Sequence, residues 1–256
     1  MALIAMAVYS TPENGKDEYL EKTLESLRET VDFTKHRLIL SVNAATIKTW
    51  KIIDDSRIAK IIDNKKNLGT AEAINLAWKT QWPGENLIKM DDDVVIHAEG
   101  WVDQMEEAIQ RDPLIGQCGL KRRDCWENVN HPDEFYKSKL VQLPHTPGQK
   151  WITVEEVHHV MGTCVMHSAA LLNKVGYLYQ PKLYGFDDSF MSFRSRLAGF
   201  KNVFLTSIDI EHIDRGDTSF QKWKENHAGE CWGPYHQTLA DYKSGARSIY
   251  YNPFQK

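Results

Sequence analysis

Apolar and polar positions alternate in a regular way over the first third of the chain. Residues 3–8 form a continuous apolar run that ends in a Ser-Thr-Pro-Glu-Asn-Gly turn, which is typical of a parallel strand buried on both faces. In the following segment, residues 17–30, the leucines recur at helical spacing. The same patterns continue along the chain and predict strands at 37–42, 58–62 and 86–90 and helices at 47–55 and 70–80.

Strands that alternate with helices predict an α/β fold in which helices flank a doubly wound, mainly parallel sheet. The second half of the chain is less regular. Its patterns predict helices at 101–111, 169–175 and 189–198 and strands at 115–120, 157–167 and 203–210. Residues 121–150 are polar and contain prolines, which favours a long loop or an excursion from the sheet.

The length of 256 residues suggests one large domain with an appendage. We expect a domain over residues 1–215, divided into halves at 1–96 and 97–215, and an aromatic-rich extension over 216–256 that packs on it. Aromatic side chains in the extension can fill the core or stack on sugars or extruded bases. They include Trp223, Trp232, Tyr235, Tyr242, Tyr250, Tyr251 and Phe254.

Charge and cysteine content narrow the class of protein. The formal net charge of −4 gives no general electrostatic reason to expect a polyanionic partner such as nucleic acid. The four cysteines include no Cys-x-x-Cys pair, so free thiols in a reducing cytoplasm are the simplest interpretation. The apolar run at 3–8 is too short for a membrane span and has no basic segment before it. We therefore expect a cytoplasmic protein without a membrane span.

Polar residues follow each of the first four predicted strands. They are Tyr9-Ser10, Asn43, Asp63-Asn64 and Asp91-Asp92-Asp93. Ligands of open α/β sheets bind outside the carboxyl ends of the strands, so this coincidence indicates a binding site.

The acidic triplet is the strongest single feature. Residues two apart on an extended chain point to the same side, so Asp91 and Asp93 face one way. A hard divalent cation with oxygen ligands, Mn²⁺ or Mg²⁺, would relieve the repulsion between them and could bridge a diphosphate. A solvated acidic turn or a helix cap is the alternative.

Three further features are weaker when taken alone. Asp187 and Asp188 precede a predicted helix, where a carboxylate can act as a general base or simply cap the helix. His212 follows the strand at 203–210 and can ligate a metal, although most histidines are structural. Arg215 and the basic residues at 121–123 can bind phosphate or lie in solvent.

The segment 67–75 reads Asn-Leu-Gly-Thr-Ala-Glu-Ala-Ile-Asn. Gly69 permits a tight loop into the helix, Thr70 is a suitable N-cap, and the free N–H groups can face a phosphate or sugar oxygen. No Gly-Lys-Ser/Thr follows, so this is not a Walker loop.

In this order, the motifs resemble those of the GT-A glycosyltransferases, most closely glycosyltransferase family 2, over roughly residues 3–215. The matching segments are Val8-Tyr9-Ser10, the segment 67–75, Asp91-Asp92-Asp93 as the family's Asp-x-Asp element, Met161 to Met166 with Val175-Gly176-Tyr177, and Asp187-Asp188 through Arg194 as its Glu-Asp element. The sequence departs from the family in reading Asn43-Ala44-Ala45-Thr46 where Asp-Asp-x-Ser is usual, and in the shorter Asp187.

The resemblance implies a metal-dependent enzyme that transfers a sugar, with inversion, from a nucleoside diphosphate, with a UDP-sugar the favoured donor. It implies that donor-binding residues lie mainly in the first half: Tyr9, Asn43, Asp63, Asn67, Gly69, Asp91 and Asp92, with Arg215 further on. It implies that Asp91, Asp93 and His212 hold Mn²⁺ or Mg²⁺, and that Asp188, beside Asp187, is the catalytic base.

Two other functions fit the same features. A nucleotidyltransferase also combines a metal with an α/β sheet, although residues 11–16 poorly match its usual loop. A sugar-nucleotide or glycan-binding module could keep the fold without turnover. The acceptor could be a glycan or a protein; a hydroxylated DNA base is possible but not favoured.

Overall fold

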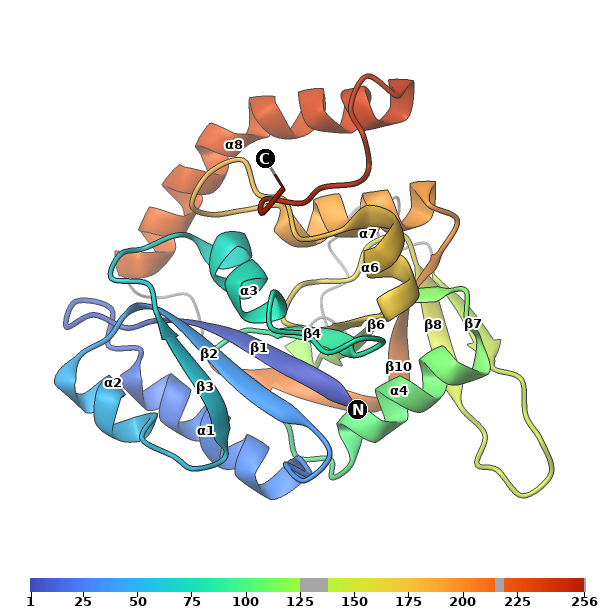
Figure 1. The fold of residues 1–256 in the computed structure, drawn as a ribbon, viewed down its shortest axis with the longest axis horizontal. Helices are drawn as coiled ribbons and strands as arrows, with labels where there is room; N and C mark the ends of the chain where they lie inside the picture. The colour runs from blue at the N-terminus through green and yellow to red at the C-terminus, as the bar shows by residue number, and fades with distance from the viewer. Residues whose placement is uncertain (125–137, 215–218, 256) are drawn as a thin grey trace.

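The computed structural model describes residues 1–124, 138–214 and 219–255, and Figure 1 shows a central sheet with helices on both faces. The sheet begins with parallel strands β1 (Ala2–Tyr9), β2 (Arg37–Ala44), β3 (Ile58–Asp63) and β4 (Asn86–Met90). The full order is β3-β2-β1-β4-β9-β6-β10-β8-β7, and the short β5 (Val94–Val95) pairs with the end of β10.

The second half adds mostly antiparallel strands. β9 (Cys164–His167) runs antiparallel between β4 and β6 (Ile115–Arg122), and β10 (Lys201–His212) is parallel to β6. β8 (Thr153–Val157) and β7 (Lys139–Gln142) complete that edge. The α/β fold with a mixed sheet, parallel in its first half, is therefore confirmed.

Alternate residues of β1 enter two separate cores, as the side-chain period of a strand requires. Ile4 and Met6 pack with α1 (Asp17–Thr30) and α4 (Trp101–Arg111) on one face. Leu3 and Ala5 pack with α3 (Thr70–Trp78), α6 (Ala169–Val175) and α7 (Asp187–Leu197) on the other. The short α2 (Ile47–Ile52) lies against α1.

Most predicted elements are present, with differences where the pattern was weakest. The predicted strand at 157–167 is wrong, because β8 ends at Val157 and β9 begins at Cys164, leaving residues 158–163 as a loop. The predicted N-cap Thr70 is also wrong. Gly69 occupies the cap with a φ of 79°, and Thr70 is the first helical residue.

The C-terminal part contains α8 (Ser219–Ser244), which lies across α7 in Figure 1. After it, Tyr251 pairs with the segment that follows α6, where its N–H donates to Val175 O and its carbonyl accepts from Tyr177 N–H. The boundary between residues 1–215 and the extension stays a prediction. No helix within the described ranges combines the length and apolar character needed to cross a membrane.

Candidate active site

A cavity of about 630 Å³ lies at the carboxyl ends of β1, β2 and β4, a volume typical of small-molecule sites. Parallel strands bring these ends to one edge of the sheet, and the end of β10 and the start of α7 close the other side. Most of the predicted site residues line it: Tyr9, Asn43, Asn67, Gly69, Asp91, Asp92, Asp93, Asp187, Asp188 and His212.

One predicted donor-binding residue does not line the cavity, and a second is not described by the structure. Asp63 is outside it, because it ends the edge strand β3 and its carboxylate pairs with Lys65. Arg215 lies outside the described residues.

Asp91, Asp93 and His212 form a compact group in which one ligand atom from each lies within 4.8 Å of the others. Pairing of β5 with β10 produces this group, because His212 is opposite Val94, the residue after Asp93. His212 Nε2 lies 3.3 Å from Asp93 Oδ1, and Ile213 N–H donates to the Asp93 carbonyl.

Lys16 is a site residue that the sequence analysis missed. Its Nζ lies 2.7 Å from Asp93 Oδ2 and 2.8 Å from Asp214 Oδ2, with all three side chains almost fully buried. Burial opposes the charge of Lys16, but Asp92, Asp93 and Asp214 outweigh it and raise the lysine's pKa. The only sequence signal was a lysine in the turn after the first strand.

Lys89 is a second missed cation. It lies on β4 with Nζ 3.1 Å from Asp187 and 3.6 Å from Asp91, so it connects the acidic triplet to the start of α7. Burial lowers its pKa, but Asp187, Asp91 and Asp188 more than compensate, so Lys89 stays charged. The sequence alone did not indicate a buried cation here, since a lysine inside an apolar strand usually marks an exposed edge of the sheet.

Asp188 is held by several groups at the first turn of α7. Its Oδ2 accepts from Gly162 N–H at 3.1 Å and lies 3.5 Å from His159 Nε2. Burial raises the carboxyl's pKa, but His159, Lys89 and the Gly162 N–H overcome this and hold the pKa well below its usual range. Asp188 is therefore an ionised carboxylate that faces the cavity.

The loop before α3 is fixed by side-chain amides. Asn43 Nδ2 donates to the Gly69 carbonyl, its Oδ1 accepts from Leu68 N–H, and Asn67 Oδ1 accepts from Gly69 N–H. A Cβ at position 69 would lie 2.5 Å from the Leu183 carbonyl oxygen, so only glycine fits this approach. Asn43 thus shapes the cavity by holding the loop.

The group formed by Asp91, Asp93 and His212 fits a divalent cation. Burial, with the neighbouring Asp93, raises the pKa of Asp91, and burial, with both neighbours, raises that of Asp92 to about 7. The buried His212 Nδ1 has no hydrogen-bond partner within the described residues. Two carboxylates and an imidazole form a donor set that suits Mn²⁺, and such an ion would relieve the excess negative charge.

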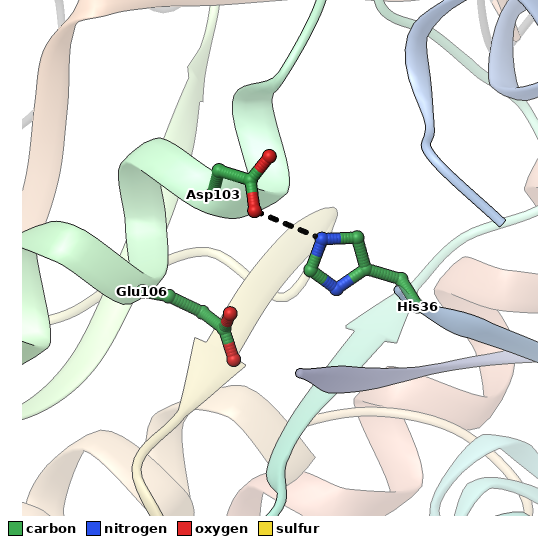
Figure 2. A group of neighbouring side chains, drawn as sticks. All are labelled: His36, Asp103 and Glu106. Carbon is green, nitrogen blue, oxygen red and sulfur yellow. Dashed lines mark hydrogen bonds and ion pairs between the residues drawn. The ribbon is translucent and has the colours of Figure 1, made fainter. Parts of the chain in front are cut away.

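A second group of this kind, His36, Asp103 and Glu106, lies at the opposite end of β1 (Figure 2). His36 Nδ1 accepts from Ala2 N–H, so the ring proton is on Nε2, which faces Asp103 Oδ1 at 3.2 Å. Both ring nitrogens are therefore already engaged by the protein. We interpret this group as a structural contact between the residue that precedes β2 and α4.

Comparison with solved structures finds the same fold in known glycosyltransferases. A mannosyltransferase, PcManGT from Pyrobaculum calidifontis, in complex with GDP-Man and Mn²⁺, matches with a TM-score of 0.64 and 16% identity over 87% of this chain and 59% of its own. TarS 1-349 from S. aureus matches with a TM-score of 0.58 and 16% identity, over 82% of this chain and 59% of its own. GalNAc-T7 with UDP, GalNAc and Mn²⁺ matches with a TM-score of 0.59 and 13% identity, over 84% of this chain and 44% of its own.

The chain thus spans about three fifths of the length of the first two structures. A sequence comparison with curated proteins found no match. The family model described as "Glycosyl transferase family 2" matches residues 5–176. Because this match covers well over half of the sequence, the chain belongs to glycosyl transferase family 2.

Proposed function

We propose that the chain is a metal-dependent glycosyltransferase that moves a sugar from a nucleoside diphosphate to an acceptor hydroxyl with inversion. One observation carries this proposal: the group Asp91, Asp93 and His212 and the ionised Asp188 face the same cavity. The first group can hold a cation beside a leaving diphosphate, and Asp188 can remove a proton from an attacking hydroxyl.

The donor occupies the side of the cavity formed by the first half of the chain. Tyr9, Asn43 and the loop at Asn67–Gly69 surround the position of the nucleoside, and the start of α3 faces the phosphates. Ala71 N–H already donates to Gln180 Oε1, so the phosphates would meet the other N–H groups of this turn. Asp92 makes a contact within the protein, because its Oδ2 accepts a hydrogen bond from Tyr9 N–H. This contact fixes the end of β1 against the acidic triplet.

Transfer follows from these positions. The acceptor oxygen forms a bond to the anomeric carbon while the bond from that carbon to the diphosphate oxygen breaks, and its electron pair leaves with the diphosphate. The proton of the acceptor hydroxyl passes to the Asp188 carboxylate. Attack opposite to the leaving group inverts the anomeric centre. A bound cation would neutralise charge that develops on the diphosphate.

Manganese and a nucleoside-diphosphate sugar are the first ligands to test. The mannosyltransferase of similar fold was solved with GDP-Man and Mn²⁺, and GalNAc-T7 with UDP, GalNAc and Mn²⁺. These complexes support a nucleotide-sugar donor and a divalent cation for this chain. We favour a UDP-sugar, with a GDP-sugar as the second choice.

A thermal-shift screen of UDP and GDP, each with and without Mn²⁺, tests the donor site. A ligand that binds only the folded state adds about 2.7 kcal/mol to the free energy of unfolding at a concentration a hundred times its Kd, and so raises the melting temperature. We expect the largest shift when nucleotide and Mn²⁺ are present together. If instead nucleoside triphosphates bind and sugar phosphates are consumed, the chain is a nucleotidyltransferase and the proposal is wrong.

Asp188→Asn tests catalysis separately. The amide keeps the shape of the side chain but cannot accept a proton, so we expect donor binding to persist while transfer falls by roughly 10²–10⁴-fold. Asp54→Asn is the matched control, because Asp54 is exposed and is not among the residues that line the cavity. Unchanged turnover in Asp188→Asn would show that Asp188 is not the base. A wild-type protein that binds the donor but shows no turnover would instead indicate a binding module.

A further inference from the structure

An aromatic ledge lies beside the candidate base. It is formed by Phe186, which lines the cavity, and by Trp232 and Tyr235 on α8. The Phe186 and Tyr235 rings stack with centroids 4.4 Å apart, and the Trp232 ring packs edge-on against Phe186 at 4.9 Å. Trp232 is 52% exposed, so one of the largest apolar side chains of the protein remains open to solvent at this position.

Contacts along α8 fix the ledge to the wall of the cavity. The buried Cys231 Sγ donates to the Tyr184 carbonyl, and Lys182 pairs with Glu230 at 2.8 Å. Tyr184 and Phe186 both line the cavity. The open Trp232 therefore lies against the wall of the cavity, and not on a separate part of the surface.

The backbone at Phe186 also indicates a specific role for its ring. Its φ of 65° is in the left-handed region, which is uncommon for a bulky residue and costs about 1–2 kcal/mol per residue. This conformation places the aromatic ring on Tyr235 while Asp187 and Asp188 begin α7. One strained residue thus joins the aromatic surface to the two carboxylates.

Charge in the cavity selects against anionic acceptors. Its described lining includes the aspartates 91, 92, 93, 187, 188 and 214. Against them stand two lysines that already contact two carboxylates each, and Arg122, which pairs with Asp124. A polyanion such as a nucleic acid would bring phosphates toward this acidic wall. An uncharged sugar would not, and its apolar C–H face can lie on an aromatic ring while a hydroxyl reaches Asp188, which lines the cavity.

We propose that this aromatic ledge is the acceptor subsite, and that the acceptor is an uncharged carbohydrate whose ring stacks on Trp232. The inference rests on the proposed glycosyl transfer and names its second substrate class. The stacked ring positions the next sugar, with a hydroxyl directed to the Asp188 carboxylate, at the edge of the donor cavity.

Saturation-transfer NMR with the full chain tests the ledge. The probes are maltose, cellobiose, lactose and chitobiose, each added with UDP and Mn²⁺ to the wild type and to Trp232→Ala, Trp232→Phe and Trp151→Ala. We expect ring-proton signals for at least one disaccharide, with affinity reduced about tenfold in Trp232→Ala and mostly kept in Trp232→Phe. Trp151→Ala is the control, because Trp151 is 62% exposed but stacks on His145, whereas Trp232 packs on the cavity residue Phe186.

Each outcome is decisive. Signals that survive in Trp232→Ala, or no signal for any disaccharide, overturn the ledge as a carbohydrate subsite. Binding of a single-stranded oligonucleotide that is lost in Trp232→Ala overturns the carbohydrate class. The rise in melting temperature with UDP and Mn²⁺ separates the two proposals. If the melting temperature rises but no disaccharide gives a signal, the ledge alone is rejected. If a disaccharide gives a signal but the melting temperature does not rise, the donor site alone is rejected.

Discussion

Lys16 Nζ holds one oxygen of Asp93 at 2.7 Å and leaves the other oxygen directed toward His212. The ion pair joins the turn after β1 to the segment after β4, and Asp214 extends it to the end of β10. Its members are too buried for water to stabilise their charges. Lys16 therefore acts as a positioning residue, which orients Asp93 toward the proposed cation.

Replacing Lys16 by methionine should destabilise the protein strongly. Two buried carboxylates lose their cation, and breaking one partner of a buried pair typically costs about 3–5 kcal/mol. We expect Mn²⁺ to raise the melting temperature of Lys16→Met by more than it raises that of the wild type, since the added cation would then neutralise the charge of Asp93.

Calorimetry of both proteins, with and without Mn²⁺, measures this difference. The control is Lys150→Met, because Lys150 is exposed and its loss should change the free energy of unfolding by no more than about 0.5 kcal/mol. An equal effect of Mn²⁺ on the Lys16 variant and the wild type would contradict a link between Lys16 and the cation site.

Gly69 and Gly84 offer a matched pair for testing the donor loop. Both have φ near the same left-handed value, 79° and 77°, but a Cβ at 69 would meet the Leu183 backbone whereas a Cβ at 84 meets nothing within 4 Å. Gly84→Ala should therefore cost only the backbone strain, about 1–2 kcal/mol. Gly69→Ala should cost more and weaken UDP binding, because the loop must move away from residue 183.

Isothermal titration with UDP and Mn²⁺, together with urea unfolding, separates the two effects. If Gly69→Ala and Gly84→Ala lose equal stability and both keep UDP affinity, the close approach of the loop to Leu183 has no role in donor binding.

The depressed pKa of Asp188 predicts a particular pH dependence of stability. The folded-state pKa lies below the unfolded value of about 3.9, so the carboxylate's stabilising contribution is fully present above that value. It is lost as pH falls through the folded-state pKa. We expect the free energy of unfolding of the wild type to exceed that of Asp188→Asn by a constant amount above about pH 5, and the difference to shrink below about pH 3.9.

His159→Gln should move this behaviour toward the ordinary carboxyl range, since His159 is the largest favourable influence on Asp188. NMR titration of the Asp188 carboxyl carbon measures the pKa directly. An unchanged pKa in His159→Gln would show that His159 does not position or stabilise the carboxylate, whatever the effect on turnover.

Local patterns were sufficient to predict most strands and helices. The apolar run of β1 and the leucine spacing of α1 required no tertiary information, because burial on both faces and helical periodicity leave direct marks in sequence. The strand predicted at 157–167 was wrong for a related reason. Val160 and Met161 lie in the loop between the two short strands, so the whole segment gives one continuous apolar signal when the strand partners are unknown.

The site was predicted where residues follow strands or directly precede helices. Asp91 and Asp93 were found because the end of a parallel strand is a recognisable place. Lys16, Lys89, Asp214 and His159 were not found, because each acquires its role from a neighbour distant in sequence, as in the pairing of Lys16 with Asp214 across the molecule. Such roles depend on tertiary packing, which no local pattern encodes.

Arg194 is the last residue of the motif that begins at Asp187, and its role is structural. Its guanidinium is buried and donates to the backbone carbonyls of Val175, Tyr177 and Ile249, so it ties α7 to α6 and to the C-terminal segment. Burial lowers its pKa to about 10, which still leaves it charged at neutral pH.

Arg194→Met should leave the carbonyls of Tyr177 and Ile249 without this donor, each costing about 1–3 kcal/mol, and should loosen the segment around Tyr251. The Val175 carbonyl would keep the N–H of Tyr251 as its donor. We expect a large fall in melting temperature and faster proteolysis near the C-terminus, whereas Arg196→Met, on the exposed side of the same helix, should change little. Mass spectrometry of the proteolytic fragments locates the cut. If both variants melt together and are cleaved alike, the three carbonyl contacts do not hold the C-terminal segment, and the ledge on α8 has some other support.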